Sequence, residues 1–143
     1  MQVAGHGSRI ASSDFRAAMR ESETLRDKLL CYAQAFMIQV AYTAVSNAHG
    51  KLEERLARWL LMAHDRVDGD EIPIIHDFLA LMLSVRRAGV TVALHRLERD
   101  GLIKPERGRI VVLDRKGLKA IANSSYGIPE AEYARLMKRK IRD

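Results

Sequence analysis

The sequence predicts a mainly α-helical chain with a small β-hairpin, in which a long amphipathic helix precedes a compact helical domain. Three observations support this fold class. The stretch from Asp14 to about Asn47 contains no proline or glycine. Two short helical patterns then follow each other closely, at 75–83 and 87–99. Apolar strand patterns at 102–103 and 110–113 flank a polar turn that contains glycine and proline.

Length and composition set the class of protein. The 143 residues suit one domain, or a small domain with an extension. Because 48% of the residues are hydrophobic and 29% are charged, we expect a packed core under a solvated surface. The single cysteine, Cys31, rules out an internal disulfide, and the N-terminus lacks a signal-peptide pattern. We expect no apolar run that approaches the ~20 residues needed to span a bilayer. The sequence therefore predicts a cytoplasmic protein with no membrane partner.

The positive charge is concentrated in the second half of the chain. The net charge is +6. Residues 86–109 contain seven Lys and Arg against three Asp and Glu, and residues 115–143 contain eight against three. The rest of the chain is net negative. This distribution favours a polyanionic partner such as nucleic acid, with an ordinary solvated surface as the alternative.

The N-terminal part is predicted to be residues 1–13, a loop or remnant strand, followed by a dimerisation helix at 14–48 that has a possible break near Ser22. At 1.5 Å per residue, some thirty helical residues would run ~45 Å, which exceeds what a small core covers. We therefore expect a homodimer seam in preference to a helix folded onto its own domain. The seam residues recur at steps of three and four and are Leu25, Leu29, Tyr32, Phe36, Val40 and Thr43.

The segment 49–122 has the layout of a winged helix-turn-helix. His49-Gly50 ends the long helix, and another helix runs from Lys51 to about His64. A loop at 65–70 and an extended segment at 72–74 lead to a short helix, a tight turn and a second helix that ends at Asp100-Gly101. The hairpin with its turn at 104–109 forms the wing. Residues 123–143 are expected to be a basic extension, with a last helix over 130–141.

Several motifs together resemble the Crp/Fnr family of bacterial transcription regulators. They are Trp59 to Val67, Phe78-Leu79-Ala80, Val85 to Thr91, Asp100 to Ile103, and Arg107 to Ile110. Family members carry a cyclic-nucleotide-type β-roll, a long dimerisation helix and then this DNA-binding domain. Here the β-roll is almost absent, since residues 1–10 resemble at most its last strand. The resemblance therefore implies the C-terminal part of such a regulator, which binds double-stranded DNA, needs no cofactor and has RNA polymerase as a possible further partner.

The DNA-reading residues follow from helix geometry and from the resemblance. Helix 86–99 is expected in the major groove, where Arg87 matches the family arginine that contacts guanine. Thr91 and His95 share its face, with Ala88 and Val92 beside them. Family members often have Glu and Arg in place of these two apolar residues, so the best-known family operator does not carry over. Phosphate contacts are expected from three arginines, for which turn capping and plain hairpin charge are the alternatives: Arg86, Arg107 and Arg109.

Other functions find less support in the sequence. The five histidines share no metal-ligand spacing, so we expect surface histidines and no metal site. No G-x-S-x-G motif or phosphate loop is present, so we do not expect an enzyme. The alternative kept open is a protein-interaction or dimerisation module that lacks its sensor and modulates a full-length relative.

Overall fold

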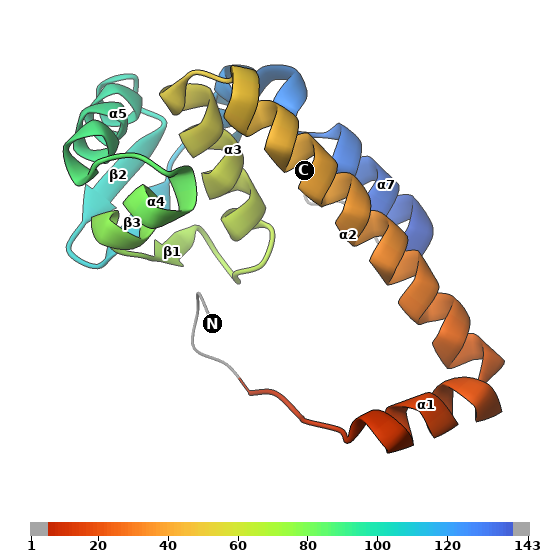
Figure 1. Ribbon diagram of the computed structural model, residues 1–143. Helices are drawn as coiled ribbons and strands as arrows, with labels where there is room; N and C mark the ends of the chain where they lie inside the picture. The colour runs from red at the N-terminus through yellow and green to blue at the C-terminus, as the bar shows by residue number, and fades with distance from the viewer. Residues whose placement is uncertain (1–5, 139–143) are drawn as a thin grey trace. The chain divides into compact units, whose positions relative to one another are not determined.

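The structure is a computed structural model that describes residues 6–138 (Figure 1). It confirms the predicted fold class, which is mainly helical with a small antiparallel sheet. The helices are α1 (Ser12–Glu21), α2 (Glu23–His49), α3 (Leu52–His64), α4 (His76–Leu83), α5 (Arg87–Arg99), α6 (Arg115–Ala122), the 3-10 turn η1 (Asn123–Ser125) and α7 (Ile128–Met137). The strands are β1 (Glu71–Pro73), β2 (Ile103–Glu106) and β3 (Arg109–Val112).

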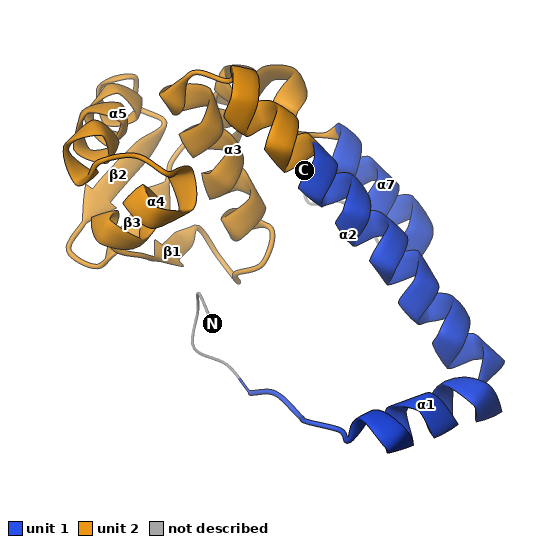
Figure 2. Cartoon of the chain, in the orientation of Figure 1, with its two compact units in different colours: residues 1–41, 128–143 blue, residues 42–127 orange. Residues whose placement is uncertain are grey.

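The chain divides into two compact units (Figure 2). One unit is residues 42–127, which we call the winged domain. The other combines residues 1–41 with 128–143, and we call its described part the helical arm. The division falls inside α2, so the last turns of that helix belong to the winged domain.

The sheet of the winged domain has the order β1-β3-β2, with antiparallel pairing throughout. Glu71 pairs with Val111, and Ile103 pairs with Val112. The two outer strands contain Pro73 and Pro105, which suits edge strands because proline lacks a backbone N–H for a second neighbour. The sequence predicted the segment at 72–74 as extended but did not predict that it pairs with the wing.

The core of the winged domain lies around α3. Helix α3 contacts α4, α5, α6 and β1, and its apolar side chains recur every three or four residues along its inner face. Helix α5 turns Val90, Leu94 and Leu97 toward the same core. The side chains buried to 1% exposure or less include Leu56, Leu60, Leu61, Ile72, Leu79, Val90, Leu94, Leu97, Ile103, Ile110 and Leu118. Helix α5 is thereby fixed along one face and leaves the opposite face open.

A partly buried polar network joins the end of α3 to α6 and Tyr126. The Arg115 guanidinium donates to Asp65 at 2.7 Å and to the Tyr126 hydroxyl at 2.8 Å, while that hydroxyl donates to Asp65 at 2.7 Å. Arg115 Nη1 also lies 3.1 Å from His64 Nδ1. Because a guanidinium can only donate, Nδ1 accepts, and His64 Nε2 donates to Asp70 at 2.8 Å.

This network corrects the expectation of surface histidines, because His64 is only 2% exposed. Its partners Asp70 and Arg115 explain how a polar ring is accommodated there, since both ring nitrogens have a polar neighbour. His6, His49 and His95 are exposed as expected, and His76 is half-buried. Among residues 6–138, no group of three or more His, Cys, Asp and Glu could hold a metal ion.

The helical arm departs from the predicted single helix. Helix α1 ends at Glu21, and Ser22 takes an extended conformation before α2 begins. The Ser22 hydroxyl accepts a hydrogen bond from the Leu25 N–H at 3.2 Å, so it caps the first turn of α2. The break near Ser22 is thus present, and residues 6–11 form no strand. The proposed remnant strand around Val3 lies partly outside the described residues.

The C-terminal helix is shifted toward the N-terminus relative to its prediction. Helix α7 runs from Ile128 to Met137, with Pro129 buried in its first turn, where its missing N–H costs no helical hydrogen bond. Lys138 is exposed, and Arg139 and Lys140 of the predicted basic end lie outside the described residues. Helix α7 belongs to the same unit as the first part of α2 and lies beside the middle of that helix (Figure 2).

Helix α2 also corrects the expectation that no apolar run approaches membrane-spanning length. Over 18 residues its mean hydropathy reaches 1.3, and 11% of that window is buried. Residues 29–48 contain no Asp, Glu, Lys or Arg, because the polar positions are filled by Gln, Thr, Ser and Asn. By length and composition α2 could cross a membrane, although core helices of globular proteins meet the same criteria. The absence of a membrane partner therefore stays a prediction.

Candidate nucleic-acid interface

Helices α4 and α5 form the helix-turn-helix, with their axes bent by 104° at the turn. Ser84 takes a left-handed conformation with φ 52°, and the Val85 N–H donates to the Ala80 carbonyl, which ends α4. Phe78 of α4 packs edge-on against Trp59 of α3, with ring centroids 6.2 Å apart. The core therefore holds α4, and through the tight turn it fixes where α5 begins.

The outer face of α5 carries most of the predicted reading residues. Arg87, Ala88, Val92 and His95 are exposed, whereas Thr91 is half-buried at the edge of this face. The Thr91 hydroxyl donates to the Arg87 carbonyl at 3.2 Å within the helix. His95 Nδ1 lies 3.2 Å from a Glu98 carboxylate oxygen. The helix thus brings these predicted residues onto one accessible surface, where their roles stay predictions.

Arg87 has an acidic neighbour on α4. Its Nε atom lies 3.5 Å from Asp77 Oδ1, and both side chains are mostly exposed. An ion pair this open to water contributes little to folding stability. Its geometric effect matters more, because a carboxylate beside Nε leaves the two terminal nitrogens of the guanidinium directed elsewhere.

Arg86 precedes α5 as its N-terminal flanking residue. Its side chain is exposed and makes no capping hydrogen bond to the helix. The turn-capping alternative therefore finds no support in the structure. Within residues 6–138, no ion pair involves Arg86, so its charge is available to a phosphate.

The two wing arginines have different surroundings. Arg109 Nη2 lies 2.6 Å from Glu106 Oε2, and Nη1 lies 3.3 Å from Glu71 Oε2. Lys104 also reaches Glu106, at 2.9 Å. Hydrogen bonds from Lys104 and then Arg109 lower the pKa of Glu106, and the bond to Glu106 raises the pKa of Arg109. Arg109 is thus already committed to acidic partners.

Arg107 is placed differently. It lies in the turn between β2 and β3, beside Gly108, whose φ of 79° lets the hairpin close tightly. The Arg107 side chain is exposed, and no ion pair joins it to any residue that the structure describes. Of the two predicted wing contacts, Arg107 is the one whose charge is uncommitted.

Sequence reasoning missed Arg99, which lies on the same face as the predicted readers. It follows His95 by four residues and Val92 by seven, so helical periodicity alone was a sufficient signal. Its Nε atom is 3.8 Å from Asp100 Oδ1, at the outer limit of an ion pair. Arg96, another cation of α5, forms an ion pair with Glu53 of α3.

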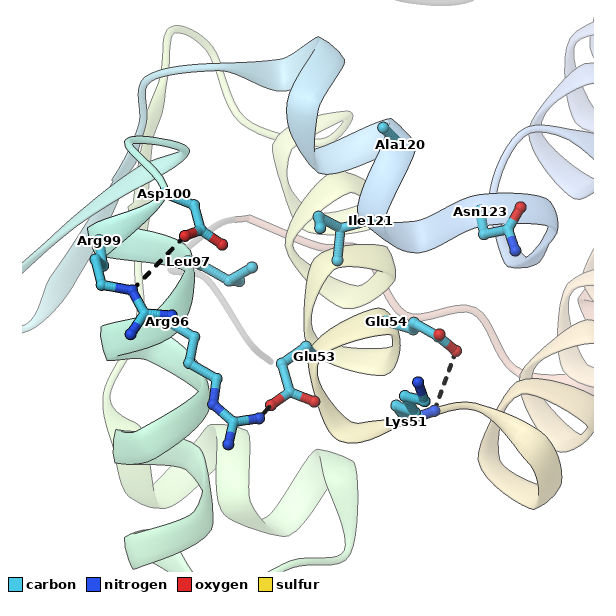
Figure 3. Close-up of a pocket in the computed structure, with 10 residues that line it drawn as sticks. All are labelled: Lys51, Glu53, Glu54, Arg96, Leu97, Arg99, Asp100, Ala120, Ile121 and Asn123. Atoms are coloured by element: carbon cyan, nitrogen blue, oxygen red, sulfur yellow. Dashed lines mark hydrogen bonds and ion pairs between the residues drawn. The ribbon is translucent and has the colours of Figure 1, made fainter.

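A hollow of about 400 Å³ lies beside the C-terminal end of α5 (Figure 3). Leu97, Ala120 and Ile121 contribute apolar surface there, and acids and bases alternate around them. The Glu53–Arg96 and Arg99–Asp100 pairs cross this region. Because its charges balance, the hollow offers no preference for an anion or a cation.

Comparison with known proteins points to one family. Residues 54–121 match the model of the Crp-like helix-turn-helix domain. The transcriptional regulator SdrP of Thermus thermophilus is 35% identical over 91 residues, which make up 59% of this chain and 45% of SdrP.

Two crystal structures agree with this match. One is TTHB099, a CRP-family transcriptional regulator from Thermus thermophilus, with 29% identity and a TM-score of 0.57 over 62% of this chain and 48% of that one. The other is a protein of Eubacterium rectale described as a Crp/Fnr-family regulator, with 25% identity and a TM-score of 0.57 over 79% and 52%. The chain spans about half the length of these relatives. In that shared part, the chain matches the Crp-like helix-turn-helix domain and is similar to transcriptional regulators of the Crp/Fnr family.

Proposed function

We propose that this chain is a sequence-specific DNA-binding transcription regulator, with α5 in the major groove and the wing on the phosphate backbone. The outer face of α5 carries the proposal. Its inner face is fixed by a buried core, while Arg87, His95 and Arg99 stand exposed on the other side. The width of the major groove admits an α-helix, and exposed cations there meet both base edges and phosphates.

Individual residues have distinct proposed roles. Arg87 reads guanine, because its terminal nitrogens suit the O6 and N7 acceptors of that base. Thr91 and His95 lie further along the same face as additional polar contacts. Arg86 and Arg107 bind phosphates through their uncommitted charges, and Arg109 contributes less because Glu106 and Glu71 already occupy it.

The active form in this proposal is a homodimer that pairs along α2. Four seam residues (Leu25, Tyr32, Phe36 and Val40) are exposed in the single chain, while Leu29 and Thr43 are half-buried. Exposed apolar side chains aligned along one helix face are typical of a surface that pairs with a partner. A cytoplasmic location and contact with RNA polymerase complete the proposal, which assigns no catalytic role.

The proposal is tested by selecting duplexes from a randomised pool and sedimenting the resulting complex. A two-fold dimer should select inverted half-sites about one helical turn apart, with two chains per duplex. Single half-sites with one chain per duplex would contradict the dimer. No binding to any duplex at low salt would overturn the DNA-binding function and favour a protein-docking module.

Two substitutions separate base reading from phosphate binding. Arg87→Ala should weaken binding to the selected duplex by ~1 to 3 kcal/mol and reduce the base preference at one position of the site. Arg107→Ala should weaken binding to all duplexes by the same amount. It should also reduce the slope of log affinity against log salt concentration by about one. Arg16→Ala, an exposed arginine of α1, is the matched control and should change neither quantity. An equal loss for Arg87→Ala on selected and random duplexes would contradict its base-reading role.

A further inference from the structure

The outer face of α5 has two apolar side chains among polar ones. Val92 is 54% exposed, and Ala88 is exposed one helical turn before it. The remaining exposed side chains of α5 are all charged or histidine: Arg87, His95, Arg96, Glu98 and Arg99. Valine is a weaker helix former than lysine or glutamine, so folding alone gives no reason for an exposed valine in the middle of this helix.

Helical geometry places both apolar residues at the centre of the outer face. Positions 88, 92, 95 and 99 follow one another at steps of four, three and four, which keeps them in one stripe. The buried Val90, Leu94 and Leu97 lie on the other side of the helix. The N-terminal half of the stripe is apolar, and its C-terminal half contains His95 and Arg99. In helix-turn-helix proteins the N-terminal residues of the second helix contact the base edges.

We propose that Ala88 and Val92 read the 5-methyl groups of pyrimidines, which are thymines in ordinary DNA. Neither side chain can form a hydrogen bond, and the thymine methyl is the apolar group that base edges present in the major groove. Side chains at i and i+4 have Cβ atoms about 5 to 6 Å apart, whereas successive base pairs lie about 3.4 Å apart. The two residues therefore address thymines about one or two base pairs apart.

This inference rests on the proposed function and narrows the sequence that the protein recognises. Arg87 directly precedes Ala88, so the guanine read by Arg87 and the thymines lie within one half-site. Exposed apolar residues elsewhere on the helix-turn-helix do not share this stripe, because Leu81 belongs to α4. The expected half-site thus contains both a guanine and at least one thymine.

Deoxyuridine substitution tests the inference because it removes the methyl group and leaves every hydrogen-bonding group of the base in place. Each thymine of the selected half-site is replaced in turn, on either strand, and the affinity is measured by mobility shift. Wild-type protein should bind about fourfold more weakly at one or two of these positions, which is the value of one buried methyl group. In Val92→Ala the loss at one such position should shrink or disappear.

The matched control is Val45→Ala, which truncates an exposed valine of α2. It should keep the wild-type response to deoxyuridine, and circular dichroism should show that both variants keep their helix content. Salt-dependent binding that no deoxyuridine weakens would overturn methyl reading and leave the proposed function intact. Methyl reading would also be overturned if Val92→Ala lowered the affinity for the thymine duplex and for the deoxyuridine duplex by the same factor. No binding to any duplex at low salt would overturn both.

Discussion

The winged domain and the first part of α2 have similarly apolar sequences, but the structure treats them differently. Leu60 and Leu94 in the winged domain are at most 1% exposed, whereas Phe36 of α2 is 53% exposed. The difference lies in what surrounds each helix. Helices α3 and α5 meet other helices and the sheet, while the first part of α2 shares its unit with α7 and leaves several apolar residues exposed.

The side of α2 that is covered is a different face of the helix from the predicted seam. Ala35 is 3% exposed, and Cys31 and Ile38 are half-buried. These residues lie away from Tyr32, Phe36 and Val40 around the helix. The winged domain therefore buries its own apolar side chains. The apolar side chains of the α2 seam are exposed in the single chain and would be buried only against a second surface.

The largest expected effect comes from the core of the winged domain. Leu60→Ala removes a side chain with 0% exposure and should lower the free energy of unfolding by ~2 to 5 kcal/mol. Urea denaturation followed by circular dichroism measures this loss. Leu30→Ala, an exposed leucine of α2, is the control and should stay within ~0.5 kcal/mol at concentrations where the protein is monomeric. Equal losses would contradict the contrast between the two regions.

The polar network of the winged domain should be the next most sensitive feature. The Arg115 and Asp65 side chains are 10% and 19% exposed, so Arg115→Met leaves a nearly buried carboxylate without its cation. We expect the free energy of unfolding to fall by ~3 kcal/mol. Arg135→Met breaks a solvent-exposed pair with Glu132 in α7 and should have no measurable effect. A stable Arg115→Met protein would show that the network does not hold α6 in place.

Substitutions in the α2 seam should change self-association and leave the folding stability of the chain unchanged. Phe36→Ala should weaken dimerisation by ~2 kcal/mol or more, because a two-fold interface loses the side chain twice. Sedimentation over a concentration series measures this shift, and the thermal unfolding of the winged domain should not change. Leu81→Ala, which truncates an exposed leucine of α4, serves as the control. Unchanged association of Phe36→Ala would place the dimer surface elsewhere.

The wing should show the smallest effect. Glu106→Gln removes the carboxylate that holds Lys104 and Arg109, so Lys104 becomes available to phosphates and Arg109 keeps only its longer contact with Glu71. We expect slightly tighter binding to random duplexes and a salt slope steeper by about one, measured by mobility shift. Glu132→Gln in α7 is the control. An unchanged salt slope would show that neither Lys104 nor Arg109 gains a phosphate contact when the Glu106 carboxylate is removed.

The same wing pair predicts a pH dependence. The pKa of Glu106 is lowered in the folded protein, so its ion pairs stabilise the wing above the ordinary glutamate pKa. That stabilisation is lost as the pH falls through the lowered value. At neutral pH the pairs are intact, so the Glu106→Gln comparison made there tests them directly.

Local patterns were sufficient to predict most of the helices. The end of α2 at His49, the whole of α5 and the hairpin all follow from apolar periodicity and from glycine positions within a few residues. Reader residues on α5 were also placed together, although Arg99 was overlooked at the same periodicity.

Contacts between distant segments could not be predicted. His64 was expected at the surface, but Arg115, 51 residues away, faces its ring and makes burial possible. The pairing of β1 with β3 and the ion pair between Arg109 and Glu71 also join segments that are far apart in the sequence. A single sequence shows which residues are polar, but it does not show which of them meet.

The Asp77–Arg87 pair has a consequence for how fast the protein would search DNA. In the free protein Asp77 stands 3.5 Å from the Arg87 Nε atom and offsets part of its charge. If Arg87 reads guanine as we propose, the guanidinium would gain little on random sequence by leaving that carboxylate, and encounters with random DNA would be short. At a guanine in register, the two base acceptors would compete with Asp77 and slow dissociation. The carboxylate would then favour sliding over random duplex and a longer residence time at the matching site.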